Sequence, residues 1–326
     1  MLKRILPLIF IVSALVSFST PVFAWDETGH KITAYIAWQR MTPDVRERVI
    51  KVLLSAPEDS QIGAFYASSG SRTSETRKRE FFMVIATWPD IIRDTKFEVR
   101  NKKYANSPWH YSDTFWEWKD GKAVMVNNVE ASGLAMQKLG DFDKVVRSSA
   151  TDAEKAIAIA WLEHLIGDIH QPLHMSGKVT DAFPKGDQGG NQFLLTPKGT
   201  PRDKQENLHH FWDAIIGISQ PNAKDQCDAD YIDPIAQDII KFYPYDKMKD
   251  KLSPDKFDIW GKESLDIATT EVYKDLNWFE APSDKYKKRA LEISQQRMAL
   301  AGYRMGDLFN EVFAAPAPTP APVTAN

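Results

Sequence analysis

The placement of histidines constrains the fold of this chain more than any other feature. The chain contains seven histidines, and each lies in a short segment rich in tryptophan or carboxylate residues. The segments are WDETGH (25–30), WHYSD (109–113), HLIGDIHQPLH (164–174) and LHHFWD (208–213), with a related WPD at 88–90. Histidine is the commonest zinc ligand, and carboxylates complete many zinc sites that do chemistry. A fold that gathers these segments would therefore form a multinuclear zinc enzyme.

The segment at 164–174 has the most informative spacing. His164 and Asp168 are four residues apart, so on a helix their side chains project from one face, one turn apart. Pro172 prevents regular continuation of that helix, and the resulting turn can return His174 to the same cavity. Any one of these side chains alone would more often be a core or capping group. Three such groups within eleven residues favour a metal site.

A second pair repeats this spacing. His209 and Asp213 are also four residues apart, on a predicted helix over 207–216. The neighbouring His210 would point about 100° away, as a surface group or a support for a ligand. His170 could likewise orient a ligand or be one, and spacing alone leaves both roles open.

The first 24 residues have the pattern of a cleavable secretory signal. A short basic start precedes an apolar stretch over 5–18, and small residues lead up to Ala24. The alternative, an uncleaved membrane anchor, is disfavoured because the stretch is short and is interrupted by Pro7. Cleavage after Ala24 would make Trp25 the mature N-terminus and would export the protein to the periplasm or the outside.

Composition restricts the remaining possibilities. Hydrophobic residues make up 43% and charged residues 26% of the 326-residue chain, as in ordinary soluble proteins. The net charge of −3 becomes −5 without the signal, which argues against a broad basic surface for duplex DNA. Bound divalent cations would still attract an anionic substrate. Cys227 is the only cysteine, so the chain has no intrachain disulfide, and we expect a free surface thiol.

Hydrophobic periodicity predicts one mostly α-helical domain over 25–313, followed by a disordered Ala/Pro-rich tail over 314–326. Thr42-Pro43 begins one helix, and Thr151 with Glu154 forms a capping box at the start of another that ends near 167. Further helices are expected over 74–86, 207–216, 231–242, 254–277 and 283–305. The few strand patterns, over 122–126 and 192–195, predict only a small β-hairpin element.

The order of the motifs carries a resemblance. Trp25-x4-His30, WPD, WH with an aspartate three residues later, HxxGDxHQPLH, GGN and NLHxxWD follow one another from Trp25 to Asp213. This order resembles the class I, zinc-dependent, single-strand-specific nucleases of fungi, plants and bacteria, in the form of a bacterial member without disulfides. The resemblance implies the all-α fold that these nucleases share with zinc phospholipase C.

The resemblance also implies three zinc ions. Asp168 would bridge two of them. Trp25 would contribute its free α-amino nitrogen and its carbonyl oxygen, and its indole would not be a ligand. Grouped by ion, the implied ligands are Asp90, His110, His164 and Asp168; Trp25, His30 and the shared Asp168; and His174, His209 and Asp213.

By the same resemblance, the reaction is hydrolysis of single-stranded DNA and RNA to products with 5′ phosphates, together with 3′-nucleotidase activity on nucleotides. Arg93 would stabilise the transition state and Asp113 would orient the attacking water, unless the two are a surface ion pair. Asn191 would bind substrate. Tyr111 would stack on a base, with a core aromatic as its alternative. The family's second stacking aromatic would fall near Lys204, where this chain has none.

Two other functions stay open from the sequence. A zinc phospholipase C has a similar zinc site, but typically carries glutamate at the position of Asp213. A periplasmic zinc-binding protein without catalysis is the alternative from another class, and Arg93 and Asp113 argue against it. We further expect a monomer with no membrane anchor after cleavage of the signal.

Overall fold

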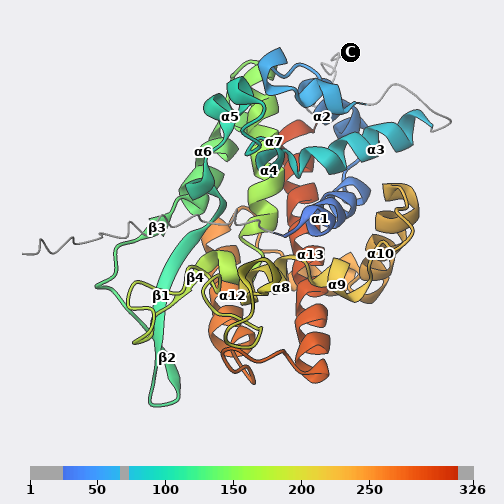
Figure 1. The fold of residues 1–326 in the computed structure, drawn as a ribbon. Helices are drawn as coiled ribbons and strands as arrows, with labels where there is room; N and C mark the ends of the chain where they lie inside the picture. Colours follow the sequence, from blue (N-terminus) through green and yellow to red (C-terminus); the bar gives the residue numbers. More distant parts are fainter. Residues whose placement is uncertain (1–24, 67–72, 315–326) are drawn as a thin grey trace, which may run out of the picture.

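Helices form most of the structure, a computed structural model that describes residues 25–66 and 73–314 (Figure 1). The predicted signal (1–24) and nearly all of the predicted tail (314–326) lie outside the described residues. No helix of the described part is both long and apolar enough to cross a membrane. The helices are α1 Glu27–Arg40, α2 Pro43–Leu53, α3 Ser74–Ile85, α4 Trp88–Ile91, α5 Glu98–Tyr104, α6 Ala135–Arg147, α7 Asp152–Asp168, α8 Leu208–Asp213, α9 Ile215–Ser219, α10 Asp228–Phe242, α11 Tyr245–Met248, α12 Phe257–Ile267 and α13 Asp284–Phe313.

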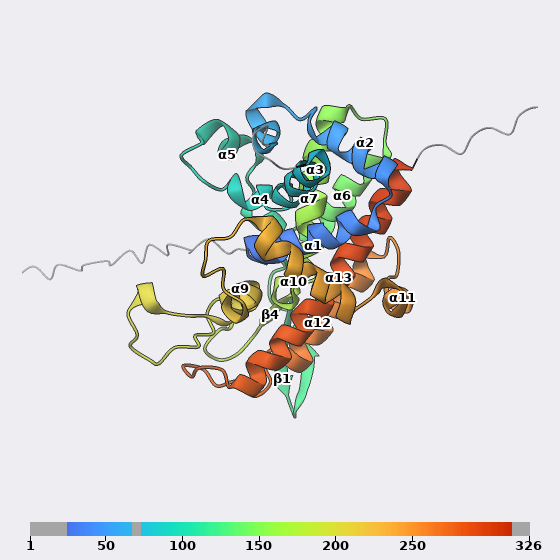
Figure 2. The same cartoon turned by 90° about the vertical axis from the view of Figure 1, so that its right-hand side faces the viewer.

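Close packing of α1 against α13 organises the centre of the molecule (Figure 2). Two glycines of α13 permit this approach. A Cβ atom on Gly302 would lie 2.5 Å from Cβ of Ile36, and one on Gly306 would lie 2.6 Å from Cβ of Arg40. Both distances are shorter than carbon atoms tolerate, so larger residues would force the two helices apart. The packing fixes the position of α1 and, with it, of His30.

Helix α7 begins with the predicted capping box. The Thr151 hydroxyl accepts the backbone N–H of Glu154, and a carboxylate oxygen of Glu154 accepts the backbone N–H of Thr151 at 2.9 Å. The C-terminal half of the helix is buried on every side, including His164 and Asp168. Both side chains are therefore held rigidly inside the protein.

A small sheet lies at one edge of the helices. Its strands are β1 Ser112–Lys119, β2 Lys122–Met125, β3 Ser132–Gly133 and β4 Ser176–Lys178. β1 pairs antiparallel with β2 and β3 and parallel with β4. Asp120 and Gly121, both with positive φ, make the tight turn of the predicted hairpin. The pairing of β4 with β1 brings the chain that follows His174 beside the chain that follows His110.

Three predicted elements differ most from the structure, and the helix predicted over 283–305 continues further, as α13, to Phe313. The predicted helix over 254–277 ends as α12 at Ile267, continues as a π-helical turn to Val272 and then stops. The predicted helix over 207–216 is interrupted at Ala214, which separates α8 from α9. The predicted strand over 192–195 is wrong, because only an isolated bridge between Leu194 and Asn207 forms there. The mostly helical fold class itself is confirmed.

Candidate metal centre

Residues from six separate segments converge beside the C-terminal end of α7. The segments are α1, α4, the 3₁₀ turn Ser107–His110, α7, the 3₁₀ turn Pro172–Met175 and α8. Three groups of histidine and aspartate have potential ligand atoms within 4.8 Å of one another. These groups are His30, His164 and Asp168; Asp90, His110 and His164; and His174, His209 and Asp213.

Asp168 lies between histidines on its two sides. Its Oδ1 atom is 3.3 Å from Nε2 of His30. Its Oδ2 atom is 3.3 Å from Nε2 of His164 and 3.4 Å from Nδ1 of His110. Each carboxylate oxygen therefore faces a different histidine environment, which is the geometry of a carboxylate that bridges two cations.

Asp90 closes the group on the side of His110 and His164. Its Oδ1 atom is 3.8 Å from Nδ1 of His110, and its Oδ2 atom is 3.9 Å from Nε2 of His164. Arg93, one helical turn further along, places Nη1 3.3 Å from Oδ1 of Asp90. Burial raises the pKa of Asp90 to about 7, although the positive charge of Arg93 acts in the opposite direction.

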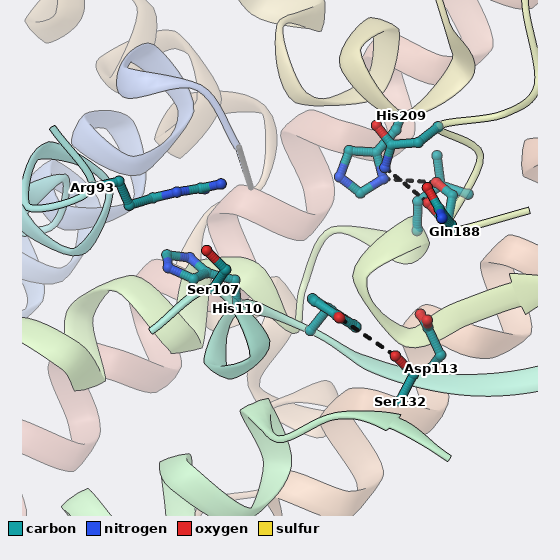
Figure 3. A pocket seen from close by; sticks show the side chains of 11 residues that line it. Arg93, Ser107, His110, Asp113, Ser132, Gln188 and His209 are labelled. Atoms are coloured by element: carbon teal, nitrogen blue, oxygen red, sulfur yellow. Dashed lines mark hydrogen bonds between the residues drawn. The ribbon is translucent and has the colours of Figure 1, made fainter. Parts of the chain in front are cut away.

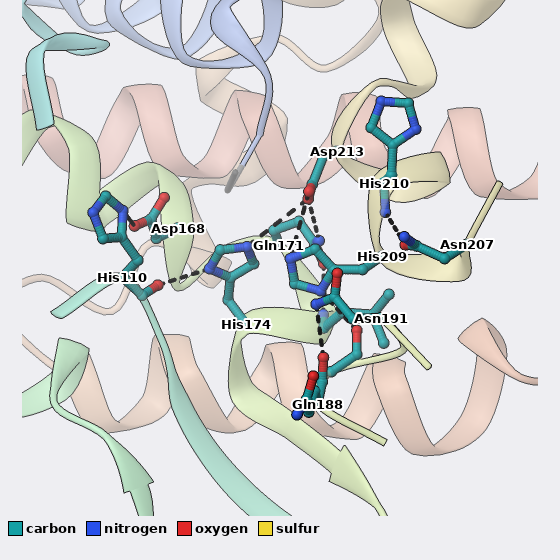
Figure 4. Close-up of polar contacts among 12 residues, drawn as sticks. His110, Asp168, Gln171, His174, Gln188, Asn191, Asn207, His209, His210 and Asp213 are labelled. Carbon is teal, nitrogen blue, oxygen red and sulfur yellow. Dashed lines mark hydrogen bonds and ion pairs between the residues drawn. The ribbon is translucent and has the colours of Figure 1, made fainter. Parts of the chain in front are cut away.

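The group around Asp213 lies on the other side of the centre (Figure 4). Nε2 of His209 is 3.4 Å from Oδ2 of Asp213, and Nε2 of His174 is 3.8 Å from Oδ1. Gln171 donates a hydrogen bond from Nε2 to Oδ1 of Asp213 at 2.6 Å, while its own Oε1 accepts the backbone N–H of Leu173. Gln171 thus connects the turn after α7 to the carboxylate on α8.

Backbone carbonyl groups orient three of the histidine rings. In each ring the Nδ1 atom is within hydrogen-bond distance of a carbonyl oxygen, which leaves Nε2 directed toward the aspartates. Such a partner fixes the tautomer and the orientation of a metal-binding histidine. The pairs are His164 with Ala86 at 2.8 Å, His174 with His110 at 2.7 Å and His209 with Gly189 at 2.7 Å.

The chemistry of these groups fits divalent cations. Both carboxylate oxygens of Asp168, both ring nitrogens of His30 and Nε2 of His110 are buried and make no hydrogen bond within the described part of the chain. Burial also raises the pKa of the Asp168 carboxyl well above its usual range and lowers the pKa values of His30 and His110. Buried polar atoms normally have partners, so bound cations would supply the missing interactions of the Asp168 oxygens and of one nitrogen in each imidazole that acts as a ligand.

The two residues that precede α1 reach into this centre. Trp25 is fully buried, and the next residue, Asp26, donates its backbone N–H to the carbonyl oxygen of Asp213 at 3.1 Å. A Cβ atom on Gly167 would lie 2.8 Å from Nδ1 of His30 and 3.7 Å from Cδ1 of Trp25. The absence of a side chain at Gly167 therefore permits the start of α1 to approach α7. Trp25 and His30 both lie close to this glycine.

A cavity of about 280 Å³ opens onto the centre (Figure 3). Arg93 reaches toward it from one side, and His209 and Gln188 lie on the other. All four predicted catalytic and substrate-binding residues line the cavity, together with four side chains that the motifs did not single out. The predicted ones are Arg93, Tyr111, Asp113 and Asn191, and the additional ones are Ser107, Ser132, Leu173 and Gln188.

Asp113 lies at the start of β1 and lines the cavity. Desolvation raises the pKa of its carboxyl well above the usual range, and the negative charge of Asp187 raises it further. Asp187 is itself buried, and it accepts the backbone N–H of Lys178 at 3.0 Å and the hydroxyl of Tyr273 at 2.6 Å. Asp187 thereby fixes the loop that carries Gln188 and Asn191 into the cavity.

The predicted substrate-binding residues are accessible from the cavity. Tyr111 is partly exposed, and its hydroxyl lies 3.4 Å from the hydroxyl of Ser132. The alternative of a core aromatic for Tyr111 does not match this position. Asn191 is also partly exposed, and its Nδ2 atom donates to the carbonyl oxygen of Gln188 at 2.8 Å.

Comparisons with known proteins agree with this arrangement. A sequence model of the S1/P1 nuclease family matches residues 25–314. The chain belongs to the S1/P1 nuclease family. It is 23% identical over 316 residues to Endonuclease 2 of Arabidopsis thaliana and 24% identical over 323 residues to Nuclease S1 of Aspergillus oryzae. Each alignment covers 93% of this chain and 96% of the relative. Nuclease P1 of Penicillium citrinum is 25% identical over 198 residues, which are 59% of this chain and 58% of that protein.

Membership of the S1/P1 nuclease family establishes the class of enzyme. Nucleases hydrolyse phosphodiester bonds, so the protein is a phosphodiesterase. The mostly helical structure with its small sheet agrees with this family. The resemblance recognised in the motif order is confirmed.

Two histidines of this S1/P1 nuclease family member lie outside the three groups. His210 is exposed and bonds Oε1 of Glu206 at 2.7 Å through Nδ1, pointing away from the centre (Figure 4). His170 is fully buried behind the turn that follows α7. Its Nδ1 atom contacts the carbonyl oxygen of Ile166, and its Nε2 atom accepts a hydrogen bond from Arg304 at 2.7 Å. His170 therefore helps to attach this turn to α13.

Gln171 is the main residue of the centre that the sequence motifs did not single out. Its position between Asp168 and His174, inside the longest motif, was the available indication. An amide side chain is not a usual zinc ligand, so a pattern of histidines and carboxylates does not include it.

Proposed function

We propose that this protein is a zinc-dependent endonuclease that hydrolyses single-stranded DNA and RNA to 5′-phosphorylated products, with 3′-nucleotidase activity. The observation that carries the proposal is Asp168, whose two buried carboxylate oxygens face different histidines and have no hydrogen-bond donor in the described chain. A carboxylate in this state fits a bridge between two zinc ions. The third group, with His174, His209 and Asp213, would hold a third ion.

Each ligand has a defined place in this proposal. Zinc supplies the nucleophile when bound, since coordination lowers the pKa of water from 15.7 toward about 7. Asp90, His110, His164 and Asp168 would hold one ion. Trp25 and His30, together with the shared Asp168, would hold the second. Trp25 would use its α-amino nitrogen and carbonyl oxygen, and its burial next to Asp26, whose N–H donates to the carbonyl oxygen of Asp213, supports that role.

The residues of the cavity would handle the substrate. The guanidinium of Arg93 would stabilise negative charge that develops on the phosphate in the transition state. The Asp113 carboxylate would orient the attacking water through a hydrogen bond. Asn191 would donate to a phosphate oxygen, and the ring of Tyr111 would stack on an unpaired base.

The proposal includes export. Cleavage after Ala24 would release a domain over 25–313 to the periplasm or the exterior and would expose the α-amino group of Trp25. The burial of Trp25 and the hydrogen bond from the N–H of Asp26 to the carbonyl oxygen of Asp213 support cleavage at this bond.

Hydrolysis assays with the purified mature protein test the function. Zinc-loaded protein should cut single-stranded DNA and RNA at least tenfold faster than duplex DNA of matched sequence, because a paired base costs a few kcal/mol to extract. It should also release phosphate from 3′-nucleotides. Equal rates on the single strand and the duplex would contradict the proposed specificity. Cleavage of phosphatidylcholine in place of nucleic acid would instead indicate a phospholipase C.

Metal removal provides a further prediction. Chelation should abolish activity and lower the melting temperature by roughly 10 °C, because a ligand at a thousandfold excess over its Kd adds about 4 kcal/mol to stability. Differential scanning calorimetry with and without chelator measures the shift, and added zinc should restore both properties. A melting temperature that does not change on chelation would argue against cations in the centre.

Gly167→Ala should damage the centre without breaking α7. The added Cβ would displace the imidazole of His30, which it would approach to 2.8 Å, so kcat should fall roughly ten- to a hundredfold. Gly140→Ala on α6 is the matched control, since nothing lies within 4 Å of its Cβ position. That variant should keep full activity. Equal effects of the two substitutions would show that helix propensity, and not the contact with His30, determines the outcome.

A further inference from the structure

Three aromatic side chains form a cluster beside the loop that enters the cavity. The indole of Trp278 is stacked on the ring of Phe279, with centroids 4.4 Å apart and planes 19° apart. The ring of Phe183 meets Trp278 edge-on at 5.1 Å. Trp278 is 40% exposed, whereas seven of the ten tryptophans of the chain are fully buried. An aromatic surface is therefore open to solvent here.

The backbone holds these rings in place. Phe279 has a φ of 68°, in the left-handed region that bulky residues rarely adopt. Its N–H donates to the carbonyl oxygen of Leu194 at 2.7 Å, which ties the turn between α12 and α13 to the chain that follows Asn191. Backbone strain of this kind persists only where the surroundings fix it, and such positions are concentrated at functional sites.

The same loop connects the cluster to the cavity. Phe183 lies five residues before Gln188, so their Cα atoms are at most about 18 Å apart. A turn shortens this path, since the N–H of Gly186 bonds the carbonyl oxygen of Phe183 at 3.0 Å. Lys185, between Phe183 and Gln188 in the sequence, is exposed and would offer a positive charge to a phosphate. A few nucleotides of single strand would span this distance.

We propose that Phe183 and Trp278 form a base-stacking platform for the part of a single-stranded substrate that extends beyond the cleaved bond. This inference rests on the proposed nuclease function. Stacking on aromatic rings tolerates any base and requires that the base be unpaired, so the platform would favour long single strands over short ones. It would also provide an aromatic contact in a chain that has Lys204 where the resemblance places one.

Substrates of different length distinguish the contribution of the platform from that of the reaction centre. The test compares zinc-loaded wild type, Trp278→Ala, Phe183→Ala and Trp278→Phe on a thymidine dinucleotide and a 12-nucleotide oligothymidylate. Loss of one stacked base should lower kcat/KM on the 12-mer about five- to tenfold, through KM. The dinucleotide occupies the cavity alone, so its kcat/KM should stay within twofold, and Trp278→Phe should keep most of the activity on the 12-mer.

Phe242→Ala is the matched control, because Phe242 on α10 is also an exposed aromatic, at 69%. It should leave both substrates unchanged. A 12-mer kcat/KM within twofold of wild type in Trp278→Ala would overturn the platform, and so would an equal loss on both substrates, which would assign the rings a structural role. Wild type that hydrolyses neither substrate would refute the nuclease proposal itself.

Discussion

Asp168→Asn should abolish hydrolysis, with a loss of at least roughly a thousandfold in kcat, and should empty at least one zinc site. The substitution keeps the volume of the side chain but removes the anion between two groups of histidines. Without that charge, the repulsion between two neighbouring dications is no longer offset. Zinc counting by mass spectrometry and single-strand hydrolysis, measured on the same sample, give the two results.

The control for Asp168→Asn is Asp233→Asn. Asp233 on α10 is also a buried carboxylate, but it pairs with Arg79 and lies outside the three groups. This variant should lose stability and still retain its zinc and its kcat. Near-normal zinc content and turnover in Asp168→Asn would show that this carboxylate does not bridge two ions.

One extra residue before Trp25 should remove the zinc held by Trp25 and His30 and nearly all activity. An amide nitrogen has no available lone pair, so an extended chain cannot offer the ligand that a free α-amino group provides. The space is also restricted, because Trp25 is fully buried and Asp26 is hydrogen-bonded to Asp213. Zinc counting, a nuclease assay and circular dichroism should show lost metal and activity with unchanged helix content.

Trp25→Ala with correct cleavage is the comparison for the extended protein. It should have a milder effect, because the backbone ligand atoms survive and only the packing of the indole is lost. The mass of each intact protein must confirm its N-terminus. Full zinc loading and normal turnover in the extended protein would rule out the α-amino ligand.

The sequence predicted those parts of the centre that depend on spacing within one helix. His164 with Asp168 and His209 with Asp213 are four residues apart, and in the structure each pair lies on one face of a helix. The convergence of His30 and His110 on Asp168 depends on tertiary packing. The sequence could suggest it only through the resemblance in motif order.

Helix α1 shows why periodicity missed part of the fold. Ten of its residues are buried, and they include His30, Lys31 and Thr33, so apolar and polar residues are mixed around the whole helix. A helix buried on all sides has no polar stripe to reveal its period. Gly302 and Gly306 allow α13 to pack closely against α1. This role can be recognised only when the partner helix is known.

The end of the helix predicted over 254–277 is incorrect for a reason that lies in the tertiary structure. The prediction carried the helix of α12 on to residue 277, but Asp275 and Phe279 adopt positive φ. Neither is a glycine, so the residue types did not indicate a left-handed backbone there. Long-range contacts impose that conformation, including the hydrogen bond from Phe279 to Leu194.

Anomalous diffraction at the zinc edge from crystals of the mature protein, with Trp25 as its first residue, tests the central claim most directly. The account predicts three peaks. Two should lie roughly 3.5–4 Å apart on either side of Asp168, and the third should lie among His174, His209 and Asp213. A fully zinc-loaded, active protein with no pair of peaks at Asp168 would contradict it.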